Sequence, residues 1–323
     1  MFDLLTITLN PTLDLSAESG PVTPGPKLRL DEPLVEPGGG GINVARAAVI
    51  LGGRARAVVA LGGLTGERVA ALLEASGVSV AVFHLDGDTR QSLSVTDRKC
   101  GAQYRFIMPG PKWTEAQPAE LLTRLEDDVR RMGPGALVVL SGSQPPGVPD
   151  TFPTDLVQRM PQARVIVDTS GPALTRLVQN PVAGAKPYVL RMDHSESEEL
   201  AARALPTAAD SLDFAQALIA AGVAEVVILA RGGEGSVLAT AVERLQCKPP
   251  MVPVDSKTGA GDSFMGGFAL TLARGKGLEA ALRIGTAAAA AAVMTPGSAL
   301  CRAEDVQRLA PECRLQTATK PVL

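Results

Sequence analysis

From residue 119 onward the chain alternates between helical stretches and short apolar runs, and this alternation constrains the fold more than any other feature. The runs include "ALVVLSGS", "RVIVDTS", "YVLRM" and "EVVILARG". Each is continuously apolar, which is typical of strands buried on both faces of a sheet. Strands separated by helices in this way predict an α/β fold around a mostly parallel sheet whose two faces are both covered.

The N-terminal part mixes this pattern with shorter alternating segments. Leu4 to Leu9 predicts a first strand that ends at a turn, Asn10-Pro11. "INVARAAVILG" and "GERVAALLEASG" predict helices on either side of the strand "ARAVVALGG". "KLRL", inside a Pro-rich stretch, predicts a short half-exposed strand. Gln91 to Met108 predicts a hairpin that turns at "RKCGA" and covers another part of the protein with one of its faces.

No linker or internal repeat divides the chain. The alanine-rich segment "IGTAAAAAAVM" predicts a closely packed helix because alanine favours helix and lets backbones approach. We therefore expect one domain over 1–323, with the strands of an inserted β lid contributed by about 13–36 and 88–109.

Composition excludes several classes of protein. A formal net charge of −3, with no block of like charges, argues against general nucleic-acid binding. The N-terminus has no basic region and only a short apolar run, so we expect neither a signal peptide nor a membrane anchor. The cysteines form no C-x-x-C pair and show no zinc-like spacing to histidine, which favours a reduced, cytoplasmic chain. They are Cys100, Cys247, Cys301 and Cys313.

The run "TGAGDS" is the clearest candidate for chemistry. Gly259, Ala260 and Gly261 predict a loop whose backbone N–H groups open onto a helix, expected over Phe264 to Arg274, and such an end attracts anions. Other nucleotide motifs fail. No segment supplies a P-loop, and in "GGGGINVA" the third glycine of a dinucleotide loop would fall at Asn43.

Asp262 places a carboxylate in this anion-attracting loop. One interpretation is structural: an Asp at or near the N-cap satisfies the first N–H groups of the helix. The other is catalytic, because phosphoryl transfer needs positive dipoles for the phosphoryl oxygens beside an acceptor for the attacking hydroxyl's proton. The second interpretation makes Asp262 the group that directs an alcohol at a bound phosphate.

Two signatures, "EPGGGGINVARAAVILGG" and "TGAGDSFMGGFAL", occur in this order and separation. With them the chain resembles the ribokinase-like (PfkB) carbohydrate kinases along nearly its whole length, and within that family it is most similar to the branch of minor ATP-dependent 6-phosphofructokinases. The resemblance implies a three-layer α/β/α sandwich with a small β-sheet lid. It also implies that Asp262 is the base in phosphorylation of fructose 6-phosphate at its 1-hydroxyl.

The resemblance also implies a sugar-phosphate site. Asp14 would bind sugar hydroxyls, the first glycine loop would lie under the sugar, and cations would hold the 6-phosphate, since Arg suits bidentate phosphate recognition. A turn Asp, a helix N-terminal Asn and solvated lid charges are the structural alternatives. The expected binders are Asp14, Lys27, Gly39, Gly40, Asn43, Arg90, Arg105 and Ser141.

On the nucleotide side, "RMDHSESEEL" stands where the family has Lys-Pro-Asn-x-x-Glu. Glu196 and Asp193 would hold Mg²⁺ of MgATP through water, although a capping box between them is the alternative. "ARGGEGSV" resembles the nucleotide loop, or else its glycines only make a turn. The nucleotide-binding residues would be Arg191, Asp193, Arg231, Gly232, Gly233 and Gly235. Ser256, Thr258 and Gly297 match a site that binds a monovalent cation, K⁺, in some relatives.

The partners implied are ATP and a sugar phosphate, with no nucleic acid and no membrane, in a homodimer built through the lids. In that family the lysine matching Lys27 can reach the neighbouring subunit's site. Kinases for tagatose 6-phosphate, fructose 1-phosphate or an unphosphorylated sugar remain alternatives. So does a sugar-phosphate or nucleotide sensor without catalysis, for which the best support is that Asp193 stands where the family has Asn.

Overall fold

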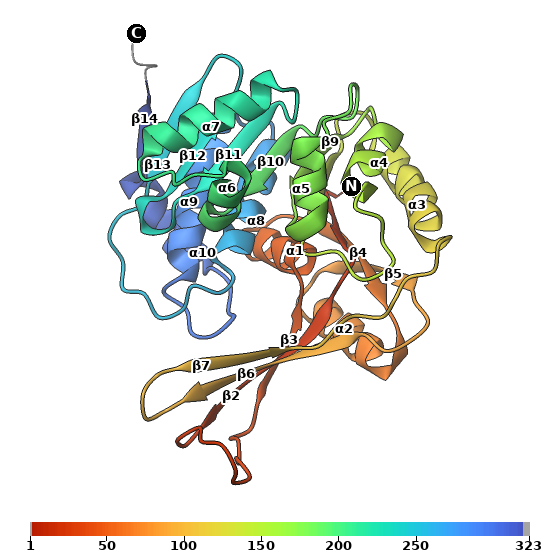
Figure 1. Ribbon diagram of the computed structural model, residues 1–323, viewed down its shortest axis with the longest axis vertical. Helices are drawn as coiled ribbons and strands as arrows, with labels where there is room; N and C mark the ends of the chain where they lie inside the picture. Colours follow the sequence, from red (N-terminus) through yellow and green to blue (C-terminus); the bar gives the residue numbers. More distant parts are fainter. Residues whose placement is uncertain (1, 319–323) are drawn as a thin grey trace.

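A ten-stranded sheet forms the centre of the computed structural model, which describes residues 2–318 (Figure 1). Its strand order is β14-β13-β12-β11-β10-β9-β8-β1-β4-β5, parallel from β11 to β5. The strands are β1 (Leu4–Thr8), β4 (Ala55–Leu61), β5 (Ser79–His84), β8 (Leu137–Ser141), β9 (Arg164–Asp168), β10 (Val189–Met192), β11 (Val226–Ala230), β12 (Ser236–Ala239), β13 (Arg244–Lys248) and β14 (Arg314–Thr317). The predicted parallel sheet is confirmed.

Helices cover both faces of this sheet. They are α1 (Gly40–Ile50), α2 (Gly63–Ala75), α3 (Gln117–Met132), α4 (Phe152–Arg159), α5 (Gly171–Gln179), α6 (His194–Ala201), α7 (Ala208–Ala220), α8 (Ala260–Ala273), α9 (Leu278–Ala292) and α10 (Ala303–Leu309), with short 3-10 turns η1 (Gly232–Glu234) and η2 (Ala310–Glu312). Neighbouring strand residues point to opposite cores. Leu4 belongs to the core that includes residues of α1, α8 and α9, and Leu5 belongs to the core that includes residues of α3, α4 and α7. The predicted α/β/α sandwich is therefore confirmed.

A separate four-stranded sheet projects from the body, seen at the bottom of Figure 1. Its strands are β2 (Thr12–Ser19), β3 (Leu34–Gly38), β6 (Arg90–Asp97) and β7 (Gln103–Ile107), in the order β3-β2-β6-β7. Asp14 lies opposite Glu36 and Ser92, and Ser94 lies opposite Arg105. Side chains at paired positions share a face, so one face of this sheet is largely polar. We call this sheet the lid.

Of the two local predictions for the lid region, one is confirmed and one is wrong. The hairpin predicted across "RKCGA" is confirmed, because β6 and β7 pair antiparallel. The strand predicted at "KLRL" is wrong: these residues lie exposed between β2 and β3, and Leu30 alone forms an isolated bridge, to Ser19. Only the end of this segment reaches a neighbouring strand, because Leu30 lies opposite Ser19 at the end of β2 and Asp31 N donates to Glu18 O at 3.1 Å.

The antiparallel edge of the main sheet was not predicted. β12, β13 and β14 pair antiparallel beyond β11, and β14 comes from the far C-terminal part of the chain. The alanine-rich helix is confirmed as α9, which packs closely on α8. Within the part of the chain that is described, no helix has the length and apolar character needed to cross a membrane.

Candidate active site

The first glycine loop is packed where three strands meet. A Cβ on Gly40 would overlap Ser141 Oγ and would lie 2.7 Å from Gly142 N, and one on Gly38 would overlap the Asp14 carboxylate. Gly39 has φ of 120°, which favours glycine, and a Cβ there would lie 2.8 Å from Thr8 Cγ2. The loop thus packs against Asp14 at Gly38 and against Ser141 at Gly40, so both predicted sugar binders adjoin the start of α1.

The second glycine loop opens α8 earlier than predicted. Gly259 is the N-cap, in the left-handed region at φ 78°, and the first intrahelical bond runs from Ser263 N to Gly259 O at 2.9 Å. The expected start at Phe264 is therefore wrong: the helix begins at Ala260, because Gly259 turns the chain into it. The backbone N–H groups of residues 260–262 have no intrahelical acceptor and can bind an anion.

Asp262 is the third residue of α8 and does not cap it. Its carboxylate forms no capping hydrogen bond with the first N–H groups, so the purely structural interpretation of Asp262 is wrong. Instead Asn43 Nδ2 donates to Asp262 Oδ2 at 2.9 Å, which joins the starts of α1 and α8. Burial raises the pKa of Asp262 to about 7; the Asn43 hydrogen bond opposes this rise and the Asp168 carboxylate adds to it. A carboxylate in this range can accept a hydroxyl proton.

A buried cation lies beside the anion-binding turn. The Arg191 guanidinium faces Gly261, where a Cβ would lie 3.0 Å from Nη2, and Arg191 Nη1 contacts Asp168 Oδ1 at 3.1 Å. Sequence reasoning identified Arg191 but missed Asp168, which also accepts a 3.4 Å hydrogen bond from Ser141 Oγ. A signal existed: Asp168 ends the predicted strand "RVIVD", and ligands of parallel sheets bind at the carboxyl ends of strands.

The polar face of the lid carries two of the predicted sugar-phosphate binders close to the body. Arg90 donates to the backbone carbonyl of Asn10 at 3.0 Å and to that of Pro11 at 3.3 Å, and it lies near Asp14. Burial raises the pKa of Asp14, while the Thr12 hydrogen bond and the Arg90 charge oppose the rise. Asp14 and Arg90 therefore form a half-buried pair of opposite charges beside the first glycine loop.

The other two predicted lid cations lie farther out. Arg105 shares the polar face of Asp14, on β7, and is exposed. Lys27 is exposed in the connection that follows the outer end of β2. Lys27 thus follows the end of β2, whereas Arg90 pairs with Thr12 at the start of β2.

Asp193 and Glu196, the residues expected to hold Mg²⁺, form a capping box at the start of α6. Asp193 Oδ1 accepts from Glu196 N at 2.8 Å, and Glu196 Oε2 accepts from Asp193 N at 2.8 Å. The capping alternative is confirmed, and it leaves one oxygen of each carboxylate outside the box. Burial, together with the charges of Asp193 and Asp168, raises the pKa of Glu196 to about 7. Glu196 thus lies in a locally acidic place that a cation would stabilise.

Among residues 2–318 no three carboxylate, histidine or cysteine side chains gather closely enough to hold a metal directly. Mg²⁺ keeps several waters and is bound through one or two carboxylates and substrate phosphates, and the oxygens of Asp193 and Glu196 outside the capping box suit such binding. The residues expected at a monovalent-cation site do come together: Ser256 Oγ donates to Gly297 O at 2.5 Å and accepts from Thr258 N at 3.2 Å.

Several buried polar atoms along the rim of the two loops have no hydrogen-bond partner in the described chain. Buried polar groups are normally paired, so each such atom calls for a ligand or water. Those near the first glycine loop and the Asp168 ion pair are Thr8 Oγ1, Asn10 Oδ1 and Arg191 Nε. The rim is therefore a polar surface prepared to bind a polar molecule.

The model of the pfkB family of carbohydrate kinases matches residues 3–305. The chain belongs to this family. It is 37% identical over 311 residues to the ATP-dependent 6-phosphofructokinase isozyme 2 of Escherichia coli, covering 96% of this chain and 98% of the relative. It is also 34% identical over 297 residues to the Escherichia coli 1-phosphofructokinase, covering 89% of this chain and 90% of the relative.

Solved structures of the Escherichia coli phosphofructokinase-2 share the fold and 37% of the sequence. The one in complex with potassium has a TM-score of 0.87, and the one in complex with fructose-6-phosphate has a TM-score of 0.86; each comparison covers 97% of this chain and 99% of the other. A further structure is described as the tetrameric inhibited form of the same protein. The resemblance stated from the two signatures is confirmed for family and fold, and the chain is a kinase of sugar phosphates.

One expected nucleotide residue of this pfkB-family chain has a structural role. The Arg231 guanidinium points inward, donating to Leu205 O, Pro206 O, Ser211 Oγ and Glu234 Oε2 at 2.6 to 3.1 Å. These hydrogen bonds of the Arg231 guanidinium hold η1 against the connection between α6 and α7. The side chain of Arg231 therefore cannot bind nucleotide in this arrangement, which corrects the expectation. The glycines of this loop, Gly232, Gly233 and Gly235, stay available through their backbone.

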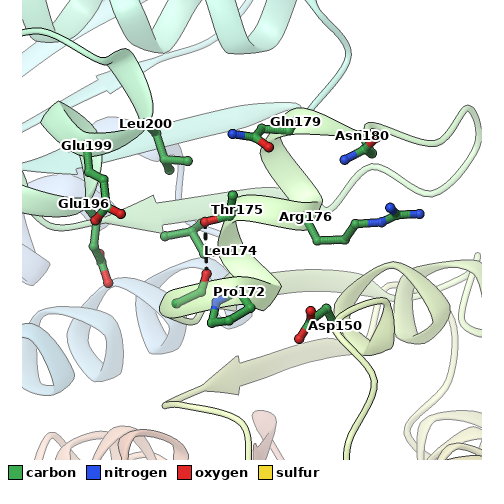
Figure 2. A pocket seen from close by; sticks show the side chains of 11 residues that line it. Asp150, Pro172, Leu174, Thr175, Arg176, Gln179, Asn180, Glu196, Glu199 and Leu200 are labelled. Atoms are coloured by element: carbon green, nitrogen blue, oxygen red, sulfur yellow. Dashed lines mark hydrogen bonds between the residues drawn. The ribbon is translucent and has the colours of Figure 1, made fainter.

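A groove of about 510 Å³ runs between α5 and α6 (Figure 2). Thr175, Arg176 and Gln179 come from α5, and Glu196 and Glu199 come from α6. Glu196 is the one predicted site residue on its wall, so the groove meets the active site at the metal side and is otherwise separate from the cluster around Asp262.

Proposed function

We propose that this pfkB-family kinase transfers the γ-phosphoryl group of MgATP to the 1-hydroxyl of fructose 6-phosphate. One observation carries the proposal: the Asp262 carboxylate and the three unused N–H groups of residues 260–262 lie in a single helical turn. A base and an anion-binding turn held by the same rigid helix can bring an alcohol and a phosphoryl group together.

In the proposed reaction the sugar O1 attacks the γ-phosphorus while its proton passes to Asp262. The O1–P bond forms, the bond between the γ-phosphorus and the β,γ-bridging oxygen breaks, and ADP leaves with the electron pair. The N–H groups of the α8 turn and the Arg191 guanidinium stabilise the negative charge of the transferring group. Asn43 holds the Asp262 carboxylate through its 2.9 Å hydrogen bond.

For the sugar phosphate, Asp14 and Ser141 offer hydroxyl partners above Gly39 and Gly40. Arg90 lies beside Asp14 and supplies the nearest cation for the 6-phosphate. We propose that 1–323 acts as one kinase domain whose lid closes over the sugar.

For the nucleotide, Glu196 and Asp193 would hold Mg²⁺ through water, and the metal would neutralise the phosphate charge. The backbones of Gly232, Gly233 and Gly235 would line the nucleotide. Ser256, Thr258 and Gly297 would hold a monovalent cation, K⁺, consistent with the potassium complex of the Escherichia coli protein.

The positions of Lys27 and Arg105 support a homodimer. Both are exposed on the outer half of the lid, beyond Asp14 and Arg90. Several apolar lid side chains are exposed as well: Leu34, Phe106 and Ile107 are 54%, 55% and 61% exposed. A second lid would cover such residues and would bring Lys27 to the neighbouring site. The unpaired cysteines in residues 2–318 fit a cytoplasmic location.

Phosphorylation of fructose 1-phosphate is the second candidate, because a 1-phosphofructokinase is 34% identical to this chain. The test is ADP formation with MgATP and a panel of free sugars, fructose 1-phosphate, tagatose 6-phosphate and fructose 6-phosphate, with the product position read by NMR. We expect preference for fructose 6-phosphate and a 1,6-bisphosphate product. Faster turnover of another substrate would overturn the assignment, and saturable binding without ADP formation would overturn the catalytic role.

A further inference from the structure

Glu36, on lid strand β3, joins two parts of the chain that are far apart in sequence. Its Oε1 accepts from Arg46 Nη2 at 2.9 Å, and its Oε2 accepts from Ser298 Oγ at 2.6 Å. The Glu36 side chain is 15% exposed and that of Arg46 is 16% exposed. Each carboxylate oxygen thus has its own donor, one from α1 and one from the connection between α9 and α10.

Arg46 carries this contact toward the proposed base. Its Nη1 donates to Pro37 O at 3.2 Å and to Asn43 Oδ1 at 3.4 Å. A guanidinium can only donate, so it holds the oxygen of the Asn43 amide on its own side. The amide nitrogen is then turned to Asp262, to which it donates at 2.9 Å. Arg46 therefore determines which end of Asn43 the Asp262 carboxylate meets.

The two ends of this chain of contacts lie at different parts of the proposed site. Glu36 pairs across the lid with Asp14, the proposed sugar binder, and its charge helps raise the pKa of Asp14. Ser298 follows Gly297, whose carbonyl accepts from Ser256. One carboxylate thus contacts the sugar-binding face, the helix that orients the base, and the loop proposed for the monovalent cation.

We propose that Glu36 is a positioning residue that couples the seating of the lid to the orientation of Asp262 and to the 295–300 loop. It acts through Arg46 and Asn43 on one side and through Ser298 on the other. The inference rests on the proposed role of Asp262 as base. None of the three residues Glu36, Arg46 and Ser298 needs to touch a substrate for this role.

Arg46→Lys tests the arm toward the base. Lysine keeps a positive charge for Glu36, but a single ammonium cannot reproduce the guanidinium contacts to Glu36, Pro37 and Asn43 together. We expect kcat to fall about tenfold or more, because small misplacements of reacting groups are costly. The Asn43 hydrogen bond favours the ionised form of Asp262, so loosening it raises the pKa of Asp262. In a plot of kcat against pH, the acid limb, along which activity rises as Asp262 ionises, then moves to higher pH. The charged groups around Asp262, namely Asp168, Arg191 and Asp14, are unchanged in this variant.

Ser298→Ala tests the other arm, and Glu36→Gln tests both. Hydrogen–deuterium exchange should become faster at 295–300 in Ser298→Ala, and at both 295–300 and the start of α1 in Glu36→Gln. Glu36→Gln should also shift the acid limb upward, whereas Ser298→Ala should leave it in place. The matched control is Arg98→Lys, which alters an exposed lid ion pair with Asp31 and should change neither exchange nor kinetics.

A lowered melting temperature in Glu36→Gln and Arg46→Lys, with an unchanged acid limb and unchanged exchange at 295–300, would show that these contacts only stabilise the fold and would overturn the inference. The exchange measurement needs no turnover. If the wild type phosphorylates none of the sugar phosphates, the proposed function fails, while the exchange at 295–300 and at α1 still decides whether Glu36 couples the two regions.

Discussion

The two glycine loops, residues 38–41 and 258–262, are both rich in glycine, but their glycines have different structural roles. In the first, a Cβ would overlap surrounding atoms of Asp14 and Ser141, so the glycines exist to let three strands and a helix pack closely. In the second, Gly259 provides a left-handed turn, and the atoms nearest to a Cβ on Gly261 belong to the end of the Arg191 side chain. Glycine in the first loop therefore permits close packing, whereas glycine in the second leaves backbone N–H groups free for an anion.

The loops also differ in what they bring to the site. The first places the sugar side, with Asn43 one turn into α1, and the second places the phosphate side, with Asp262 in the first turn of α8. The Asn43–Asp262 hydrogen bond is the contact at which the two meet.

Asp262→Asn should lower kcat by about 10³-fold while leaving the affinity for both substrates nearly unchanged, because it removes a general base and keeps the shape of the side chain. Steady-state kinetics and titration calorimetry measure the two effects. Asp255→Asn, an exposed change a few residues before the loop, is the control. Turnover within a few-fold of the wild type would remove Asp262 from the role of base.

The same variant should be more stable than the wild type at alkaline pH. Burial raises the pKa of Asp262 from 3.8 to about 7, so the folded state holds the proton more tightly than the unfolded state. The stabilising contribution of protonated Asp262 is full below pH 4 and is lost as pH rises through 7. Thermal unfolding should therefore show a higher melting temperature for Asp262→Asn at pH 8 and no such gain at pH 4.

Arg191→Met should lower kcat by about 10²-fold, as loss of one transition-state donor does. It should also move the acid limb of kcat to higher pH, because the Arg191 charge lowers the pKa of Asp262. Arg191→Lys keeps the charge and should keep the limb near its wild-type position. A limb that does not move in Arg191→Met would contradict the electrostatic link between the two residues.

Gly40→Ala and Gly261→Ala test whether a side chain costs more stability in the first glycine loop than in the second. Gly40→Ala should cost about 1–3 kcal/mol of stability, because Gly142 N and Ser141 cannot move away easily. In Gly261→Ala the nearest atoms are those of the Arg191 guanidinium, at 3.0 Å and beyond, which need shift by only a few tenths of an ångström, so stability should fall less than in Gly40→Ala while the KM for ATP rises. Gly277→Ala is the control, since a Cβ there meets nothing within 4 Å. Denaturant unfolding and ATP kinetics distinguish them, and equal stability losses in both loops would refute the distinction.

Asp193→Asn should have the smallest effect. Asparagine caps a helix about as well as aspartate, so the free energy of unfolding should change by less than about 0.5 kcal/mol. The Asp193 charge raises the pKa of Glu196, so its removal should leave Glu196 more fully ionised at neutral pH. Mg²⁺ titration of the rate should then show either a lower requirement for metal, as expected, or no change, in which case the extra carboxylate of this chain is only a helix cap.

Much of the fold was predictable because its signals are local. Continuous apolar runs predicted the parallel strands, and the glycine loops with Asp262 predicted the anion-binding turn. The polar alternation of "KLRL" predicted a strand wrongly, since β2 ends at Ser19 and only Leu30 of this segment pairs with it. The antiparallel edge of β12, β13 and β14 was missed for the same reason, because β14 pairs with a strand about 70 residues earlier.

Short segments of the sequence already identify the chemical groups of the site: a base, two glycine loops and a set of cations. Tertiary structure alone decided which of these groups meet. It turned Arg231 inward, brought the unpredicted Asp168 to Arg191, and placed Glu36 against Ser298 across 262 positions of the chain. The physical reason is that backbone propensities act over a few residues, whereas a buried charge takes whichever partner the packed fold brings within hydrogen-bond reach.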